Sequence, residues 1–433
     1  MKKVAFCTLG CKVNQYESEA VSNLFENAGY TIVDFDEIAD IYVINTCTVT
    51  GISARKSRQM VRRAKSLNRE AIIVVMGCYS QTSPEEVSNI PGVDLIIGTS
   101  DRNKIIEYVE EITQCGKQLN TVEGIMKKRD FEELHVDKYK ERTRAYLKIQ
   151  EGCTQFCSYC IIPYARGPVR SRNPEEVLKE VKRLSDNGFK EVILTGIHVA
   201  SYGRDLRNTS LLDIICRIHE VDGIERIRLS SIEPTTITND FVQIVKNLNK
   251  LCPHYHISLQ SGCDETLKRM NRKYDTSEYR SVVERLRDNI NDVAITTDVM
   301  VGFPGESDNE FEQTYEFLQE ICFSKMHVFK FSPRKGTPAY SFTNQVPGDV
   351  KEERSRKLIE LSDECALKFQ RQFEGRTMPV LFEQEAGENS IEGLTPNYIR
   401  VFCRGSNSLK GEIRDVVLKN TYNDFMDGEI INP

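Results

Sequence analysis

Apolar runs alternate with amphipathic stretches along the first 115 residues of the chain. Short continuous apolar runs predict buried strands, and apolar positions spaced three and four residues apart predict helices. We expect helices near 15–28 and 53–69, between four strands at 4–10, 41–45, 71–77 and 94–98. This strand–helix–strand order predicts a doubly wound parallel sheet.

A second alternating series occupies residues 144–371, after a charged and irregular segment at 116–143 that we interpret as a linker. Helices are expected at 174–187 and 308–320, among others. Six strands are expected at 145–150, 191–196, 226–231, 254–260, 294–302 and 325–332. Six strand–helix units fall short of the eight of a complete barrel. The pattern therefore predicts an open (β/α)6 barrel, whose open side suits a large substrate.

A long charged amphipathic helix follows Pro347 and is expected to stop at Gly375, and from Met378 onward the pattern changes to short strands. Residues 372–433 are therefore expected to form a small all-β barrel of the size of oligonucleotide-binding barrels. The predicted fold class is α/β. Its expected parts are a first domain at 1–115, the linker, a central barrel at 144–371 and the terminal β domain.

Composition narrows the class of protein. The 433 residues are 39% hydrophobic and 28% charged, which indicates a globular chain. No apolar run approaches the ~20 residues of a membrane-spanning helix, and the amino terminus turns polar too early for a signal peptide. A cytoplasmic enzyme without membrane contact is expected. The net charge of −6 argues against general nucleic-acid coating, so any such contact must use local basic patches.

Fourteen cysteines in a chain without an export signal need an explanation. A disulfide framework is not expected in a reducing compartment, which leaves metal binding, catalysis or core packing. Cys153, Cys157 and Cys160 have the spacing C-x3-C-x2-C directly after the first expected barrel strand. Three such thiolates can hold three irons of a [4Fe–4S] cluster and leave the fourth without a protein ligand. Structural zinc is the alternative, but it uses four ligands, and the nearest histidine is His135.

A second group of cysteines is recognisable by placement rather than spacing. Cys11, Cys47 and Cys78 each follow an expected parallel strand of the first domain within two residues. Strand ends on that side of a doubly wound sheet converge at the ligand-binding edge. The three thiols are either a second three-cysteine cluster site or unrelated cysteines at strand ends, and placement alone leaves both open.

The motifs around these cysteines resemble a known family. The C-x3-C-x2-C motif after the first strand of an open barrel resembles the radical S-adenosylmethionine superfamily. LGCKVNQYESE, INTCTVT and VMGCYSQ resemble the amino-terminal domain of its methylthiotransferases, and GCTQFCSYCIIPYARG, LQSGCDETLKRMNRKY, TTDVMVGFPGES and FSPRKGTPAY resemble their barrel. The resemblance spans essentially the whole chain. Within the family, LGCKVNQYES and CTQFCSYC are most similar to members acting on N6-threonylcarbamoyladenosine beside the tRNA anticodon.

The resemblance implies two [4Fe–4S] clusters, one on each cysteine trio, with S-adenosylmethionine as co-substrate. One S-adenosylmethionine would methylate a sulfur at the first-domain cluster, and another, at the barrel cluster, would give the radical that activates adenine carbon 2. The electron would come from a donor of flavodoxin or ferredoxin type. By position, the S-adenosylmethionine-binding residues would be Tyr159, Gly196, Ser231, Glu233 and Gln260. Packing or strand-end capping is the alternative for each.

Two regions are candidates for RNA contact. Residues 53–69 carry seven basic and no acidic side chains, including Arg55, Arg58 and Arg62. A helix of this charge suits a tRNA backbone, and further basic positions are Arg166, Arg170, Arg172, Arg272 and Lys273. The terminal β domain holds six basic and ten acidic residues, so it would bind tRNA through a local face near Tyr398, Arg400, Arg404 and Lys410. The carboxylate of the modified base would favour an arginine, with Arg166 and Arg334 as candidates.

Two other functions remain open at this level. One is the same chemistry on another adenosine modification or on a ribosomal-protein aspartate. The other is a zinc-dependent RNA-binding protein without catalysis.

Overall fold

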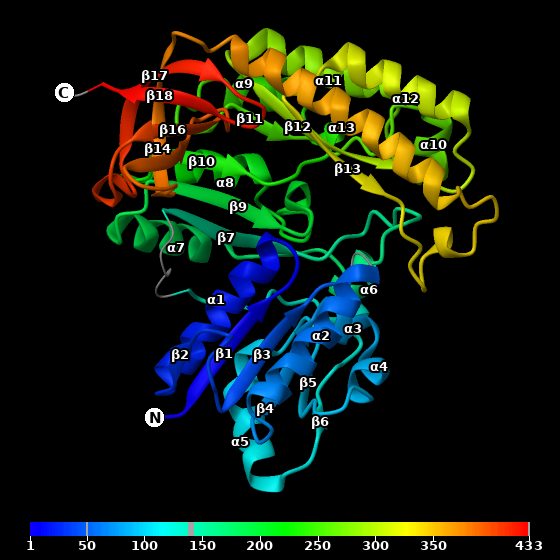
Figure 1. Ribbon diagram of the computed structural model, residues 1–433, viewed down its shortest axis with the longest axis vertical. Helices are drawn as coiled ribbons and strands as arrows, with labels where there is room; N and C mark the ends of the chain where they lie inside the picture. Colours follow the sequence, from blue (N-terminus) through cyan, green and yellow to red (C-terminus); the bar gives the residue numbers. More distant parts are fainter. Residues whose placement is uncertain (49–50, 137–142, 432–433) are drawn as a thin grey trace.

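The computed structural model describes residues 1–48, 51–136 and 143–431, with side chains from residue 54 onward in the second range. Parts of three predicted features lie outside these residues: the motif after Cys47, the linker and the last two residues of the β domain. Figure 1 shows the first domain, in blue to cyan, next to the central strands, with the C-terminal barrel, in orange to red, at one end of them.

A six-stranded sheet forms the first domain, and all of its pairings are parallel. Its order is β2-β1-β3-β4-β5-β6. The strands are β1 (Lys3–Thr8), β2 (Thr31–Val33), β3 (Ile41–Thr46), β4 (Ile72–Gly77), β5 (Leu95–Ile97) and β6 (Leu119–Asn120). The chain runs from β1 outward to β2 and then returns to β3 on the other side. The order therefore reverses between β1 and β3, which is where ligands bind in open sheets of this type.

Helices cover both faces of this sheet, as the alternation of strand and helix predicts. Successive side chains of β3 point to opposite faces: Val43 packs with α1 (Lys12–Asn27) and α5 (Ile105–Cys115), and Ile44 packs with α2 (Gly51–Leu67). Two short helices, α3 (Cys78–Thr82) and α4 (Pro84–Ser88), follow β4. The doubly wound prediction is confirmed.

The two edge strands β2 and β6 were not predicted. They are three and two residues long, too short for an apolar run or a period to stand out. β6 lies in the segment interpreted as a linker, and the same segment contributes Leu134 and Val136, which are buried against Tyr16 of α1. This part of 116–143 is therefore packed onto the first domain.

The central strands form an open barrel. β7 (Arg144–Glu151), β9 (Glu191–Gly196) and β10 (Arg226–Leu229) are parallel, as are β11 (His254–His256), β12 (Ala294–Val301) and β13 (Lys325–Lys330). Bridges Ile227–Leu251 and Ile232–Ile257 join the two groups, so six parallel strands follow one another as predicted. A short antiparallel strand, β8 (Arg170–Ser171), extends the β7 edge.

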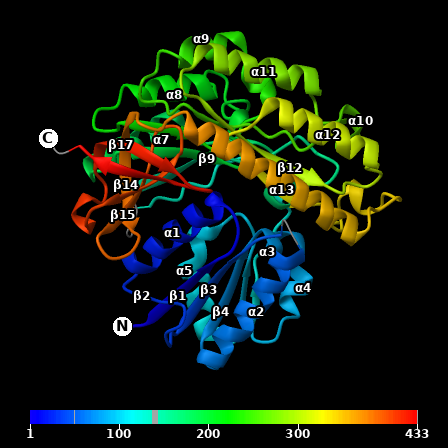
Figure 2. The same cartoon turned by 45° about the horizontal axis from the view of Figure 1, so that its top comes forward.

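Helices alternate with these strands. They are α6 (Ile162–Arg166), α7 (Pro174–Asp186), α8 (Leu211–His219), α9 (Asn239–Val245), α10 (Asp264–Arg269), α11 (Thr276–Asn289) and α12 (Asp308–Ile321). α12 starts where predicted because Ser307 and Glu310 form a capping box. α13 (Gly348–Arg371) lies along β13, as Figure 1 shows, and leads to the C-terminal barrel. Figure 2 shows α13 crossing above the first domain.

The last strands close into a five-stranded barrel, β14-β15-β16-β18-β17. They are β14 (Thr377–Glu385), β15 (Ser390–Leu394), β16 (Arg400–Arg404), β17 (Ile413–Thr421) and β18 (Met426–Ile430). The small all-β barrel is confirmed. It packs against the amino-terminal ends of the central strands: Arg226, the first residue of β10, donates to Leu394 O at 2.9 Å and Pro379 O at 2.8 Å. Within the described residues, no helix is both long and apolar enough to cross a bilayer.

Candidate functional site

The cysteines of the first domain lie together where β1, β3 and β4 end, on both sides of the point at which the strand order reverses. A Cβ placed on Gly10 would lie 3.0 Å from Cys47 Cβ, so the turn that carries Cys11 lies directly against Cys47. Cys78 is close enough for Cys11 and Cys47 to act on its pKa. Cys47 and Cys78 are buried, and Cys11 is exposed. We call these three residues the first-domain triad.

Gly77 sets the direction in which Cys78 leaves β4. Its φ is +101°, and an added Cβ would lie 2.5 Å from Asn45 Oδ1 and 2.7 Å from Thr46 O. We expect Gly77→Ala to destabilise the fold by about 1–3 kcal/mol, because left-handed strain and a backbone clash coincide. Urea unfolding measures the effect, with Gly188→Ala as control, since an added methyl there meets nothing within 4 Å. Equal losses in both variants would contradict the clash.

Asn14, in the first turn of α1, holds the ends of β1 and β3 together by hydrogen bonds. Its side-chain nitrogen donates to Leu9 O at 2.8 Å and Thr46 O at 3.0 Å. Its side-chain oxygen accepts the Arg166 Nη2 proton at 2.7 Å. Arg166 lies in α6 of the central domain, and its Nε donates to Cys78 Sγ at 3.1 Å. An arginine of one domain is thus bonded to a cysteine sulfur of another.

Arg166 belongs to a buried ionic network that joins the two domains. Glu17 of α1 has no exposed area. Its carboxylate forms ion pairs with Arg166 Nη1 at 2.5 Å, Arg102 Nη1 at 2.5 Å and Lys148 Nζ at 2.8 Å. Glu151, at the end of β7, contacts Lys148 and lies 3.3 Å from Arg166. Burial alone would raise the pKa of Glu17, but these three cations hold it well below its usual range.

The barrel triad, Cys153, Cys157 and Cys160, lies in the loop directly after β7. Cys160 N donates to Cys157 O at 2.9 Å, which folds the loop back on itself. The loop is anchored by Ser158, whose nitrogen donates to Met270 O at 3.0 Å. Burial raises the pKa of Cys153 to about 11 and that of Cys160 to about 12. The free thiols are therefore protonated at neutral pH, and binding a metal releases their protons.

A guanidinium group donates a hydrogen bond to this triad. Arg272 Nη1 donates to Cys157 Sγ at 3.3 Å, and Arg272 is held by Glu233 Oε2 at 2.6 Å and by Tyr274 OH at 2.8 Å. One arginine N–H per triad is thus directed at a sulfur. Hydrogen bonds of this kind stabilise charge on the sulfurs of iron–sulfur clusters and adjust their potential.

Two consecutive residues connect the triads. Arg166 binds Cys78 Sγ, and the carbonyl oxygen of the next residue, Gly167, accepts the backbone N–H of Cys153 at 3.0 Å. The triads are therefore neighbours across the domain boundary, although 75 residues separate Cys78 and Cys153 in the sequence. Their donors, three thiols with a guanidinium partner in each case, fit iron–sulfur clusters with one open iron.

No three histidine, cysteine, aspartate or glutamate side chains within the described residues are grouped as ligands of a single metal ion. A three-cysteine cluster site makes a different demand, because each thiolate binds an iron of its own.

A cavity of about 1100 Å³ opens between the three domains. Cys11 and Lys12 line it from the first domain, and Gly196 and Ser231 line it from the ends of the central strands. Of the other residues predicted to bind S-adenosylmethionine, Tyr159 packs edge-on against Phe303. Glu233 holds Arg272, and Gln260, with a φ of +75°, pairs with Val299. The cavity therefore joins the first-domain triad to two of the five predicted cofactor positions.

Comparison with known proteins identifies the family. A model described as the radical SAM superfamily matches residues 147–318, and one described as uncharacterized protein family UPF0004 matches residues 3–98. Threonylcarbamoyladenosine tRNA methylthiotransferase MtaB of Bacillus subtilis is 44% identical, over 100% of this chain and 97% of the relative. The chain belongs to the radical SAM tRNA methylthiotransferases. Its cofactors are S-adenosylmethionine and [4Fe–4S] clusters.

Other relatives of this methylthiotransferase are named for two different modified adenosines. The Thermotoga maritima protein of the same name as the Bacillus relative is 37% identical, over 92% of this chain and 91% of the relative. The tRNA-2-methylthio-N(6)-dimethylallyladenosine synthase of Clostridium tetani is also 37% identical, over 98% of this chain and 95% of the relative. The zinc-protein alternative is wrong, because the chain is an enzyme of this family.

A solved structure shares the fold. The radical S-adenosylmethionine methyltransferase TsrM from Kitasatospora setae has a TM-score of 0.59 at 15% identity, and the likeness covers 78% of this chain and 77% of that one.

Four of the basic side chains predicted to contact RNA are buried in the methylthiotransferase, whereas Lys273 is exposed. Arg166 and Arg172 have no exposed area, Arg170 is 3% exposed, and Arg272 is buried against Glu233. Arg166 as an RNA contact, or as the partner of the substrate carboxylate, is therefore wrong, because glutamates of distant segments already bind it. Nothing in the local sequence signals that Arg166 and Arg272 bind cysteine sulfurs. On α2, by contrast, Arg55 and Arg62 are exposed, and Arg58 is half-buried, donating to Tyr79 OH at 3.1 Å.

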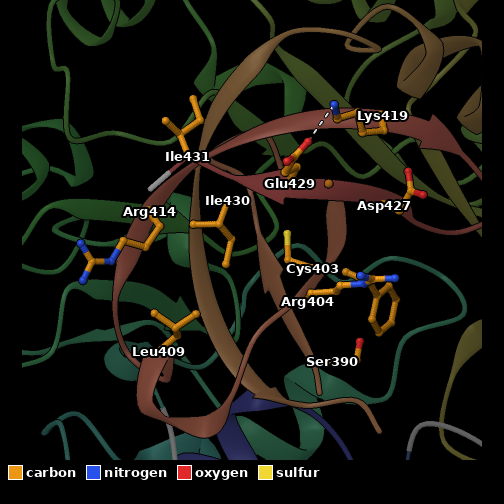
Figure 3. A pocket seen from close by; sticks show the side chains of 12 residues that line it. Ser390, Cys403, Arg404, Leu409, Arg414, Lys419, Asp427, Glu429, Ile430 and Ile431 are labelled. Carbon is orange, nitrogen blue, oxygen red and sulfur yellow. Dashed lines mark ion pairs between the residues drawn. The ribbon is translucent and has the colours of Figure 1, made fainter. Parts of the chain in front are cut away.

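The predicted RNA face of the C-terminal barrel is only partly exposed. Tyr398 points into the molecule, where it stacks on His254 with ring centroids 4.5 Å apart. Arg400 is paired with Glu392 at 2.7 Å, and Lys410 is half-buried. Arg404 is exposed and lines a separate hollow of about 860 Å³ on this barrel. Figure 3 shows Arg414 and Lys419 at opposite edges of that hollow, with Lys419 paired to Glu429.

Proposed function

We propose that this enzyme adds a methylthio group to carbon 2 of N6-threonylcarbamoyladenosine beside the anticodon of tRNA, with two [4Fe–4S] clusters and two molecules of S-adenosylmethionine. The observation that carries the proposal is the pairing of two cysteine triads across the Arg166–Gly167 segment. The substrate is supported by the Bacillus relative, which is named for threonylcarbamoyladenosine and matches the whole chain. The dimethylallyladenosine synthase of Clostridium tetani and the Thermotoga relative named for threonylcarbamoyladenosine are both 37% identical, so it is the 44% identity of the Bacillus relative that favours this substrate.

The chemistry explains why such a site is needed. Carbon 2 of adenine carries a hydrogen with no acidity and no leaving group, so general acid–base catalysis has little to act on. A reduced cluster with bound S-adenosylmethionine supplies radical chemistry that removes such a hydrogen. Cys153, Cys157 and Cys160 would hold the cluster of the barrel. Arg272 would stabilise charge on Cys157, and Tyr159, Gly196 and Ser231 would help to bind the co-substrate.

The first-domain triad would hold the second cluster beside the cavity. Cys11, Cys47 and Cys78 would bind three of its irons, and Arg166 would stabilise charge on Cys78. The exposure of Cys11 toward the cavity would bring the sulfur to be transferred close to the substrate base. The exposed Arg55 and Arg62 of α2 would contact the tRNA backbone. An electron donor of flavodoxin or ferredoxin type would reduce the barrel cluster.

Nucleoside analysis tests the substrate. Deleting the gene should remove the 2-methylthio form of N6-threonylcarbamoyladenosine from tRNA and leave the unmethylthiolated nucleoside in its place. Persistence of the methylthio form would contradict the assignment. Loss of a methylthio group from dimethylallyladenosine instead would assign the enzyme to the other branch of the family.

Removal of one first-domain cysteine should separate the two half-reactions. We expect Cys47→Ala to stop methylthio transfer while the anaerobic protein still cleaves S-adenosylmethionine to 5′-deoxyadenosine. The barrel triad keeps its thiols and its own arginine in this variant. Chromatography of the small-molecule products and of the digested tRNA measures both activities. Loss of both at once would show that the triads do not act as separate sites.

A further inference from the structure

The cavity between the domains is larger than a single small ligand requires. Its volume of about 1100 Å³ is at the top of the range for small-molecule sites, about 300–1000 Å³. Its wall includes Cys11 and Lys12 of the first domain and Tyr398 and Arg400 of the C-terminal barrel. It therefore has room for a modified base beside the reacting sulfur.

Most of the charged side chains that line the cavity already have an oppositely charged partner. Arg228 is bound to Glu191 at 2.9 Å, Lys325 to Asp363 at 3.0 Å and Arg400 to Glu392 at 2.7 Å. The two acids of the wall also have cationic or imidazole partners. These are Asp298, 3.3 Å from His256, and Asp424, 3.4 Å from Arg400.

Lys12 is the exception. Within the described residues, no ion pair or hydrogen bond joins its ammonium to another group, and the ring of Tyr146 lies 6.0 Å away at the centroid. A bound anion would supply the charge partner that this ammonium does not have among the described residues.

Two further features of the same cavity favour an anionic, hydrogen-bonding ligand. Lys12 is the first residue of α1, a sixteen-residue helix with no acidic side chain in its first turn, so the positive end of the helix dipole is not neutralised there. His254 lines the cavity, is 7% exposed, and its Nδ1 has no hydrogen-bond partner among the described residues. A buried polar atom without a partner is costly unless a ligand satisfies it.

We propose that Lys12 binds the carboxylate of the substrate's N6 side chain and thereby selects carboxylate-bearing adenosines over those with an apolar side chain. The inference rests on the proposed function, because it takes a threonylcarbamoyl group as the ligand. Lys12 directly follows Cys11, so the anion would be fixed next to the triad that is to deliver the sulfur. A dimethylallyl side chain offers Lys12 no charge to bind.

Binding measurements with three RNAs test this. Anticodon stem-loops carrying N6-threonylcarbamoyladenosine, its methyl ester or N6-dimethylallyladenosine are titrated against anaerobically reconstituted enzyme, followed by fluorescence anisotropy. The wild type should bind the acid roughly 10- to 100-fold more tightly than the ester, the range of a charged hydrogen bond. Lys12→Gln should bind acid and ester equally, and Lys12→Arg should keep most of the preference. Lys104→Gln, which removes an exposed charge from the same domain, should behave like the wild type.

The other outcomes have distinct meanings. If Lys12→Gln weakens acid and ester by the same factor, Lys12 binds an RNA phosphate and the proposal is overturned. It is also overturned if Lys12→Gln keeps the preference, or if the wild type has none. A wild type that prefers the acid, and a Lys12→Gln variant that keeps that preference, leave the proposed function standing. Turnover of the dimethylallyl stem-loop alone by the wild type would instead refute the proposed function itself.

Discussion

Replacing Cys157 with alanine should abolish the formation of 5′-deoxyadenosine from S-adenosylmethionine. Cys157 is buried, and it is the barrel cysteine whose sulfur receives Arg272. With two thiols left, a three-cysteine cluster loses the ligand of one iron and its hydrogen bond from Arg272 at the same time. Iron content should fall from about eight to about four per chain, because the first-domain triad is intact. Methylthio transfer should disappear together with cleavage.

The control for this prediction is another cysteine of the same domain. Cys216 lies on α8, outside the barrel, and is half-buried like two members of the triad. Cys216→Ala should keep the iron content and the cleavage rate of the wild type. Undiminished production of 5′-deoxyadenosine by Cys157→Ala would refute the assignment of the barrel triad as the cluster site.

Replacing Glu17 with glutamine should lower the free energy of unfolding by about 3–5 kcal/mol, the range for breaking a buried ion pair. Glu17 is fully buried and neutralises Arg102, Lys148 and Arg166. Without its charge, Glu151 and Glu132 remain to balance the three cations, of which Arg166 lies farther from Glu151 than from Glu17. The loss follows from uncompensated buried charge, since glutamine has nearly the same shape.

Urea unfolding of the metal-free protein checks this prediction. Glu37→Gln is the matched control in the same domain, because Glu37 makes an exposed pair with Lys3 at 3.8 Å, and such pairs contribute about 0–1 kcal/mol. A Glu17→Gln variant as stable as the Glu37→Gln variant would show that the network does not hold the two domains together.

The order of elements followed from the sequence because it depends on local patterns. The runs at 41–45 and 71–77 became β3 and β4, which are buried on both faces and need no partner to be recognised. The helix expected at 308–320 became α12, whose first turn is fixed locally by a capping box. The edge strands β2 and β6 could not be predicted, because strands of three and two residues exist only through pairing with a neighbour already in place.

Of the two cysteine triads, one could be recognised from local spacing and the other depended on the strand order. Cys153, Cys157 and Cys160 lie within eight residues of one another, so a single loop brings them together whatever the rest of the fold. The grouping of Cys11, Cys47 and Cys78 required the strand order, because β1 and β3 are adjacent in space while β2 intervenes in the sequence. The parallel-sheet prediction left open whether these three cysteines form one site or are unrelated cysteines at strand ends, and it did not place them next to the barrel triad.

Taken by itself, the amino-acid sequence determined the three kinds of domain, the family motifs and the barrel triad, since each is written in periodicity or in short-range spacing. Only the tertiary structure decided what the charged side chains do. Arg166 and Arg55 carry the same group, yet one is bonded to a glutamate 149 residues away and the other is exposed. Lys12 lines the cavity without a carboxylate partner among the described residues. Charge is a property of the residue, whereas burial and pairing arise between segments that the chain brings together only when it folds.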